Sequence, residues 1–150
     1  MARRVFFSFH YQLDVWRVNQ IRNLPNIVGC AAAGFQDASL WEEAKRKGDA
    51  SVKRMIDDGL NNTSVTVVCI GHATASRKYI YYEIDRSIQR GNAIIGLRIH
   101  HLKDHLGHTA HAGMIPPQLS AHSCPIYAYD NHPDLALWIE SAAQARRFWG

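Results

Sequence analysis

Five short apolar segments recur along the chain, at intervals that leave room for a helix between neighbours. The clearest are residues 5–9, 65–70 and 93–99, which are rich in Val, Ile and Phe and are mostly apolar at both odd and even positions. This pattern is typical of strands covered on both faces, as in a parallel sheet. Weaker segments at 27–31 and 126–129 complete the alternation. The sequence therefore predicts five strands.

Apolar residues at helical spacing predict helices between these strands. Asp14 is expected to cap a helix over residues 14–23, and Pro25 forbids its continuation. A second helix is predicted over residues 49–58, and Gly59 suits a left-handed stop at its end. Each helix lies between two predicted strands, so the pattern is that of strand–helix–strand units.

The third predicted helix has the strongest apolar stripe. Either Thr74 or Ser76 is expected to cap it, isoleucines repeat every four residues up to Gln89, and Gly91 lies just past its end. A closing helix is predicted to begin at Pro133, because proline is favoured in a first turn. The stripe marks the face of the third helix that packs on the sheet.

Two segments depart from this regular alternation. Ser39 and Glu42 have the three-residue spacing of a capping box, which we expect to open only a short turn. Residues 100–125 show no periodicity and contain six histidines and the pair Pro116-Pro117. A connection of that length between two elements invites a functional interpretation.

The alternation favours an α/β fold with right-handed crossovers. Five strands in 150 residues suit a flavodoxin-like three-layer sandwich, with a parallel sheet of order 2-1-3-4-5 and a single domain over residues 1–150. In that order the ligand crevice lies where the loops after the first and third strands diverge. Those loops contain residues 8–11 and 71–74. Candidate chemistry is therefore expected there.

Composition narrows the class of protein. Hydrophobic residues make up 47% of the chain and charged ones 20%, which suits a globular core rather than a disordered chain. The net charge, 17 − 13 = +4, is too small and scattered for a nucleic-acid protein, and no apolar stretch is long enough to span a membrane. Cys30, Cys69 and Cys124 form an odd set without a CxxC pair, as reduced thiols do. We expect a cytoplasmic protein with neither nucleic acid nor membrane as partner.

Several common sites of α/β proteins are excluded by missing motifs. The chain has neither a GxxxxGK[ST] loop nor a G-x-G-x-x-G after a strand, and it lacks the carboxylates of a phosphoacceptor receiver domain. The histidines of residues 100–125 have spacings that would suit zinc if the segment were helical, but Gly107 and Gly113 break a helix. We therefore expect no metal site and a solvated, pH-sensitive loop.

One carboxylate stands out near the expected crevice. Glu83 shares one side of its predicted helix with Tyr79, Ile80 and Ser87, so it borders the buried isoleucine stripe. That position predicts a partly desolvated carboxyl beside aromatic rings. The alternative is a solvated glutamate that pairs with Arg86 or Ser87, and spacing alone favours this alternative because glutamate is mostly exposed.

Longer blocks of sequence resemble a known family. The block IDDGLNNTSVTVVCIG (residues 56–71), the following Ser76 and the segment YIYYEI (79–84) resemble the middle of Toll/interleukin-receptor (TIR) domains, and VFFSFH (5–10) resembles their first strand. With DASLW (37–41), the chain is most similar to the TIR-like proteins of bacterial Thoeris antiphage defence. The resemblance covers roughly residues 3–105.

The resemblance implies an activity and roles for residues. It implies a flavodoxin-like fold and cleavage of the nicotinamide glycosidic bond of NAD, which would be a substrate rather than a cofactor. Glu83 matches the catalytic glutamate, and residues 7–10 match part of the nucleotide pocket. Two departures are His10, where many TIR enzymes have Arg, and Tyr79-Ile80, where they have Trp-Cys.

The product and partners follow from the same resemblance. Thoeris members make a cyclised ADP-ribose signal that a separate effector protein senses, and TIR-like enzymes often assemble, so a homo-oligomer is expected in the active state. Attack by water instead would give ADP-ribose, and sequence does not decide between the two products. The alternative from another class is a non-catalytic adaptor that works by self-association, and a nucleotide-binding module without cleavage is a third option.

Further binding candidates each have a structural alternative. His10 would bond a ribose or phosphate, or serve as a simple donor at the strand end. One of Phe7 and Phe9 must face the core, and we favour Phe9 with Trp41 as an aromatic platform for a base. Hydroxyls near the crevice would contact the sugar or phosphates, or merely cap backbone groups. The complete set of expected substrate-binding residues is Phe7, Ser8, Phe9, His10, Ser39, Trp41 and Tyr79.

Overall fold

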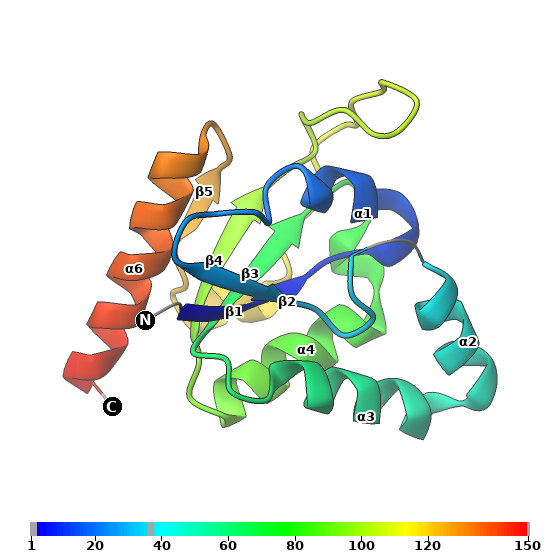
Figure 1. The fold of residues 1–150 in the computed structure, drawn as a ribbon, viewed down its shortest axis with the longest axis horizontal. Helices are drawn as coiled ribbons and strands as arrows, with labels where there is room; N and C mark the ends of the chain where they lie inside the picture. Colours follow the sequence, from blue (N-terminus) through cyan, green and yellow to red (C-terminus); the bar gives the residue numbers. More distant parts are fainter. Residues whose placement is uncertain (1–2, 36–37, 150) are drawn as a thin grey trace.

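The computed structural model describes residues 3–35 and 38–149, and within them it shows one five-stranded parallel sheet (Figure 1). The order is β2-β1-β3-β4-β5, as predicted. The strands are β1 Arg3–Ser8, β2 Ile27–Cys30, β3 Val65–Ile70, β4 Ala93–Arg98 and β5 Ile126–Ala128. Their ends differ from the predicted ones by at most two residues, so the α/β class and the flavodoxin-like order are confirmed.

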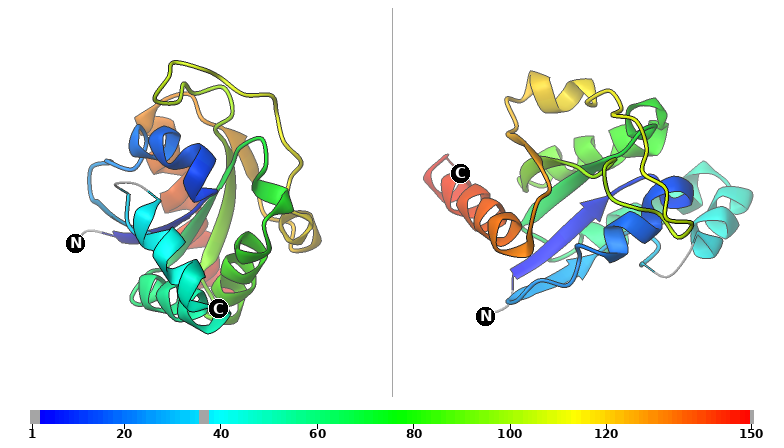
Figure 2. Two further views of the ribbon diagram at one scale, coloured as in Figure 1. Left: turned by 90° about the vertical axis from the view of Figure 1, so that its right-hand side faces the viewer. Right: turned by 90° about the horizontal axis from the view of Figure 1, so that it is seen from above.

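Helices cover both faces of the sheet. They are α1 Tyr11–Asn19, α2 Ser39–Lys47, α3 Asp49–Leu60, the 3₁₀ turn η1 Thr74–Ser76, α4 Lys78–Gln89, α5 Pro117–Ala121 and α6 His132–Trp149. Helices α1 and α6 lie on one face, and α3, α4 and α5 lie on the other (Figures 1 and 2). The arrangement is the expected three-layer sandwich.

Alternating strand residues divide the core between the two faces. Val67 and Ile95 pack in the cluster that includes α6, whereas Val68 and Ile94 pack in the cluster that includes α4. Each such buried aliphatic side chain contributes roughly 1.5–3 kcal/mol through its removal from water. Ser8, an even-numbered residue at the end of β1, consequently faces α4. This parity brings the end of the first strand to the inner face of α4.

Helix α1 begins earlier than predicted. It starts at Tyr11, and its N-cap is His10, whose Nδ1 accepts a hydrogen bond from the Leu13 N–H at 3.2 Å. The prediction that Asp14 caps this helix was wrong. Asp14 lies within the helical segment, and its carboxylate pairs with Arg17 at 2.9 Å. The imidazole ring occupies the position that a shorter capping side chain usually takes.

Gly59 does not end its helix as predicted. Helix α3 continues to Leu60 with Gly59 inside it. A Cβ at this glycine would lie 3.1 Å from the ring of Phe6 and 3.2 Å from the carbonyl oxygen of Ala31. The residue is therefore small because α3 packs closely on the sheet, not because the backbone turns left-handed.

The segment around Ser39 is a full helix rather than a short turn. Helix α2 runs for nine residues from Ser39 itself, with Ala38 at the N-cap position. Its described residues provide no side-chain cap hydrogen bond, so the predicted capping box was wrong. Asp37, part of the block that resembles Thoeris proteins, lies outside the described residues.

The helix predicted after β3 is split in two. Thr74 belongs to η1, where its hydroxyl accepts a hydrogen bond from the Gly71 N–H at 2.8 Å and so closes the end of β3. Helix α4 begins only at Lys78, with Arg77 at the N-cap, so neither Thr74 nor Ser76 caps it. Gly91 lies just past the helix with φ of 78°, as predicted.

The long connection after β4 is fastened to α1. Arg17 donates hydrogen bonds to the carbonyl oxygens of Leu102 at 2.8 Å and His108 at 3.0 Å. Within residues 3–35 and 38–149, no three His, Cys, Asp or Glu side chains are grouped as metal ligands. Among the helices of that same part, none is both long and apolar enough to cross a membrane.

Candidate active site

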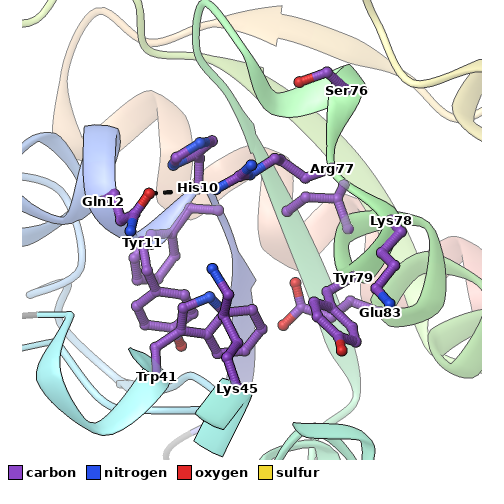
Figure 3. A pocket seen from close by; sticks show the side chains of 12 residues that line it. His10, Tyr11, Gln12, Trp41, Lys45, Ser76, Arg77, Lys78, Tyr79 and Glu83 are labelled. Carbon is purple, nitrogen blue, oxygen red and sulfur yellow. Dashed lines mark hydrogen bonds between the residues drawn. The ribbon is translucent and has the colours of Figure 1, made fainter. Parts of the chain in front are cut away.

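A cavity of about 380 Å³ lies where the chain segments that follow β1 and β3 come together (Figure 3). Its volume is at the lower end of the range of small-molecule sites, about 300–1,000 Å³. Three segments line it: the start of α1, helix α2 and the start of α4. The lining residues are Phe9, His10, Tyr11, Gln12, Trp41, Lys45, Ser76, Arg77, Lys78, Tyr79, Ile80 and Glu83.

Glu83 forms the acidic part of this cavity. Its side chain is only 1% exposed, because it lies on the face of α4 that packs on the sheet with Ile80 and Ile84. The Ser8 hydroxyl donates a hydrogen bond to Oε1 at 2.7 Å, while Oε2 accepts none from the described residues. Figure 3 shows the carboxyl directed from α4 toward Trp41. One carboxyl oxygen is thus fixed, and the other is buried beside the cavity without a hydrogen-bond partner among the described residues.

The alternative of a solvated glutamate is wrong. Arg86 pairs with Asp57 at 3.0 Å instead of with Glu83. Ser87 donates to the backbone carbonyl oxygen of Glu83 at 2.8 Å and leaves its carboxyl untouched. The isoleucine stripe, rather than neighbouring polar residues, determines the environment of this side chain.

Burial changes the acidity of the Glu83 carboxyl. Removal from water raises its pKa to about 8, although the hydrogen bond from Ser8 favours the charged form. The group is therefore largely protonated at neutral pH. A positive charge beside Oε2 would favour the carboxylate, so the site is suited to a cationic ligand or to a positive charge that develops during a reaction.

Aromatic rings form the opposite wall. Phe9 and Tyr11 lie 4.3 Å apart between ring centroids, Tyr11 stacks on Trp41 at 4.7 Å, and Trp41 meets Tyr79 edge to face at 5.5 Å. Phe7 is fully buried and packs edge to face against Phe35. The structure thus places Phe9 and Trp41 at the cavity and Phe7 in the core. Planar rings are well suited to bind a flat heterocycle by stacking.

His10 has both a structural position and a place at the cavity. Burial, with the nearby charges of Arg77 and Lys45, lowers its pKa to about 4, so the ring is neutral. Because Nδ1 accepts the Leu13 N–H, the neutral ring carries its proton on Nε2. The ring therefore caps α1 with one nitrogen and keeps a donor on the other.

The three remaining candidates are placed differently. Ser8 is fully buried and contacts the carboxyl of Glu83 rather than the cavity. Ser39, the first residue of α2, is exposed and is not among the described residues that line the cavity. Tyr79 lines it, and its hydroxyl donates to Asp49 at 2.8 Å.

Sequence reasoning missed several polar residues of the cavity. Lys45 lies one helical turn after Trp41, so the period of α2 was the signal that would have found it. Gln12 and Arg77 come from the first turn of α1 and the N-cap of α4, and no local pattern links them. Tyr11 belongs to the loop of residues 8–11 where chemistry is expected, but it is not among the predicted binding residues.

Fold and site together define a flavodoxin-like α/β protein in which Glu83 is the one carboxyl among the described residues that line an aromatic crevice at the carboxyl edge of the sheet. Residues 6–104 match the model of the family described as "Thoeris protein ThsB, TIR-like domain", and the chain belongs to that family. The resemblance found in the sequence is confirmed.

A curated relative extends this comparison. The chain is 52% identical over 119 residues to a protein of Bacillus cereus (strain MSX-D12) named "Putative cyclic ADP-D-ribose synthase ThsB1". The alignment covers 77% of this chain and 62% of that protein, so the chain spans about three fifths of the length of its relative.

Proposed function

We propose that this protein cleaves the glycosidic bond between nicotinamide and ribose in NAD and releases a cyclic ADP-ribose signal in antiphage defence. Membership of the ThsB family and the name of the Bacillus relative support this activity. The structural observation that carries the proposal is the buried Glu83 carboxyl, which lines the aromatic cavity and has one oxygen fixed by Ser8 and one without a hydrogen-bond partner among the described residues.

The proposed reaction suits a site with a single carboxylate. When the bond between C1′ and the pyridinium nitrogen breaks, its electron pair stays on the nitrogen and nicotinamide leaves as a neutral molecule. No acid is needed to protonate this leaving group, unlike in ordinary glycoside hydrolysis. Positive charge develops on the ribose, and the Glu83 carboxylate stabilises it in a site that excludes water.

The same carboxyl responds to the substrate. The pyridinium is cationic before the bond breaks, so its approach favours the charged form of a group whose pKa burial has raised to about 8. Stacking on Tyr11 and Trp41 would hold the nicotinamide ring near Oε2. Binding energy from the aromatic wall is thereby used to position the reacting bond.

The second half of the reaction determines the product. Water that adds to C1′ loses a proton and gives ADP-ribose, whereas a nucleophilic atom in the adenosine half of the same molecule gives a ring and releases one proton. We propose the cyclic outcome, in line with the name of the Bacillus relative. NAD is then consumed as a substrate, and no separate cofactor is required.

The proposal extends to partners and location. A small nucleotide diffuses away from its source, so a separate effector protein would have to bind it to complete the response. We propose that the active form contains several copies of this chain and acts in the cytoplasm. Cys30, Cys69 and Cys124 are free thiols, which suits a reducing compartment.

Mass spectrometry of NAD reaction products, on protein concentrated to promote assembly, tests the proposal. The expected result is free nicotinamide with a cyclic nucleotide for the wild type and no turnover for Glu83→Gln, with both proteins showing the same circular dichroism spectrum. A wild type without turnover in every assembled state contradicts the proposal and supports the adaptor. NAD that binds and remains intact supports a binding module instead.

A further inference from the structure

Basic side chains lie at the mouth of the cavity, away from Glu83. Arg77 at the N-cap of α4 donates from Nη2 to Gln12 Oε1 at 3.3 Å. Gln12 in turn donates from Nε2 to Glu42 Oε1 at 2.5 Å, and the same oxygen lies 3.5 Å from the Nζ of Lys45. A chain of polar contacts thus joins α4, α1 and α2 across the mouth. We refer to Arg77, Gln12, Glu42 and Lys45 as the rim.

The rim brings two positive charges from two different helices to the cavity. Figure 3 shows Arg77 reaching from α4 toward Gln12 and His10, and Lys45 extending from α2 beside Trp41. Both side chains are part-buried, so their charges are less screened than those of fully exposed residues. Lys78, in contrast, is exposed and pairs with Asp49 at 3.4 Å, outside the rim.

The N-terminus of α4 adds a third source of positive potential. This helix has 12 residues, and no hydrogen bond from a described side chain caps its first turn. Ser76, Arg77, Lys78 and Tyr79, which surround that terminus, all line the cavity. The unpaired N–H groups of a first turn and the helix dipole together favour an anion.

The acidic side chain of Glu83 and the basic side chains of the rim line the same cavity. The positively charged part of a ligand would favour the charged form of the Glu83 carboxyl, whereas Arg77, Lys45 and the helix terminus favour a negatively charged part. A dinucleotide with a cationic ring at one end and a diphosphate in the middle meets both requirements. The modest cavity volume, about 380 Å³, also leaves part of such a molecule at the mouth, where the rim lies.

We infer that Arg77, Lys45 and the N-terminus of α4 form a diphosphate subsite, and that Glu42 and Gln12 hold the two basic side chains in position while competing with the ligand for them. The inference rests on the proposed function and deepens it, because it makes the enzyme specific for a diphosphate-containing dinucleotide over the corresponding nucleoside. His10, which also lines the cavity, remains neutral, so the cationic contact comes from α2 and α4.

Steady-state kinetics with NAD and with nicotinamide riboside test the subsite, because the two share the reacting bond and differ in the diphosphate. Arg77→Ala and Lys45→Ala are each expected to raise KM for NAD about tenfold with kcat little changed, the usual effect of losing a charged hydrogen bond. Cleavage of the riboside should stay at the wild-type rate. The matched controls are Arg90→Ala at the end of α4 and Lys47→Ala at the end of α2, which are exposed and outside the rim.

A variant that is expected to lower KM for NAD, rather than raise it, strengthens the test. Glu42→Gln keeps a hydrogen-bond acceptor for Gln12 and removes the negative charge that competes for Lys45, so KM for NAD should fall about threefold, within the range of exposed ion pairs. A merely structural role for the rim would not lower KM. Equal losses with both substrates, or no loss with NAD, would overturn the subsite.

Calorimetric titration with ADP-ribose separates the two proposals. One outcome is that neither the wild type nor any variant cleaves NAD, while ADP-ribose binds the wild type and binds Arg77→Ala about tenfold more weakly. In that case the proposed activity is wrong and the proposed subsite is supported. If NAD is cleaved and ADP-ribose binds Arg77→Ala as it binds Arg90→Ala, the subsite is wrong and the activity stands. Absence of ADP-ribose binding by the wild type also overturns the subsite.

Discussion

The hydroxyl of Ser8 and the carboxyl of Glu83 form a buried hydrogen bond of 2.7 Å between the last residue of β1 and the middle of α4. Neither side chain has more than 1% of its surface exposed. The bond fixes the orientation of the carboxyl and favours its charged form, while burial favours the neutral form. Ser8 therefore orients the Glu83 carboxyl and is not among the described residues that line the cavity.

This relationship predicts the pH dependence of NAD cleavage. In the proposed reaction the carboxylate is the active form, and the pKa of the group in the free protein is about 8, so kcat/KM should rise tenfold per pH unit below that value and level off above it. Ser8→Ala removes a donor to the charged form, so the rising limb should move alkaline by about one unit. Activity at pH 7 should then fall about tenfold.

Measurement of kcat/KM from pH 6 to 9.5 checks both expectations. Ser51→Ala, on α3 and away from the cavity, is the matched control and should reproduce the wild-type profile. A flat wild-type profile, or a Ser8→Ala profile that is lower but has the same midpoint, contradicts the assigned role.

The same pKa shift predicts a cost in stability. In the unfolded chain the carboxyl of Glu83 loses its proton near its ordinary value of 4.5, but in the folded protein it keeps the proton until about pH 8. Unfolding between these values releases a proton, so wild-type stability falls as pH rises through this window. Glu83→Gln removes this dependence.

The melting temperature of Glu83→Gln should therefore exceed that of the wild type by roughly 10–15 °C at pH 8 and should be close to it at pH 4.5. Differential scanning calorimetry at both pH values measures the difference, and the other titrating groups cancel because the two proteins share them. A difference in melting temperature that narrows as the pH rises would have the opposite pH dependence and would rule out a buried, proton-binding carboxyl.

Parts of this site follow directly from the sequence. Ile80 and Ile84 mark the inner face of α4, and the helical period places Glu83 at the border of that face, although spacing alone favoured a solvated side chain. The apolar sequence of β3 likewise predicts a buried strand at the centre of the sheet. These signals are local, because each depends on residues within one or two helical turns or one strand.

Other parts depend on contacts between distant segments. His10 caps α1 although Asp14 has the higher capping preference, because the carboxylate pairs with Arg17. Arg77 meets Gln12 across 65 residues of sequence. No local periodicity encodes such a contact, which forms only when the sheet order brings the ends of β1 and β3 together.

The aromatic wall predicts a specific defect in substrate binding. Trp41 stacks on Tyr11 and borders Tyr79, so Trp41→Leu should raise KM for NAD about tenfold, as expected for the loss of one base-stacking ring. Trp41→Phe keeps an aromatic face and should recover most of the affinity. Steady-state kinetics and melting temperatures of both variants provide the measurement.

Trp138 offers a matched control for this substitution. It stacks on Tyr127 at 4.2 Å between ring centroids and lies on α6, outside the cavity. Trp138→Leu should lower the melting temperature and leave KM unchanged. An equal rise in KM for Trp138→Leu and Trp41→Leu would show that general loosening, not stacking in the cavity, explains the effect.

The hydrogen bonds of Arg17 predict that α1 stabilises the segment after β4. The guanidinium of Arg17 bonds Asp14 and the carbonyl oxygens of Leu102 and His108, and the residue is only 4% exposed. Arg17→Met leaves the Asp14 carboxyl, whose pKa burial already raises, without its partner. The free energy of unfolding should fall by roughly 3–5 kcal/mol, the usual consequence of breaking a buried ion pair.

Urea denaturation and hydrogen exchange measure the two consequences of this substitution. Amides of residues 102–110 should exchange faster in Arg17→Met, because two of their carbonyl contacts are lost. Asp14→Asn combined with Arg17→Met removes the isolated carboxyl and should recover part of the stability without restoring protection of that segment. Arg54→Met, at an exposed position on α3, should change neither quantity. Full recovery of protection in the double variant would show that the segment is held by contacts other than those of Arg17.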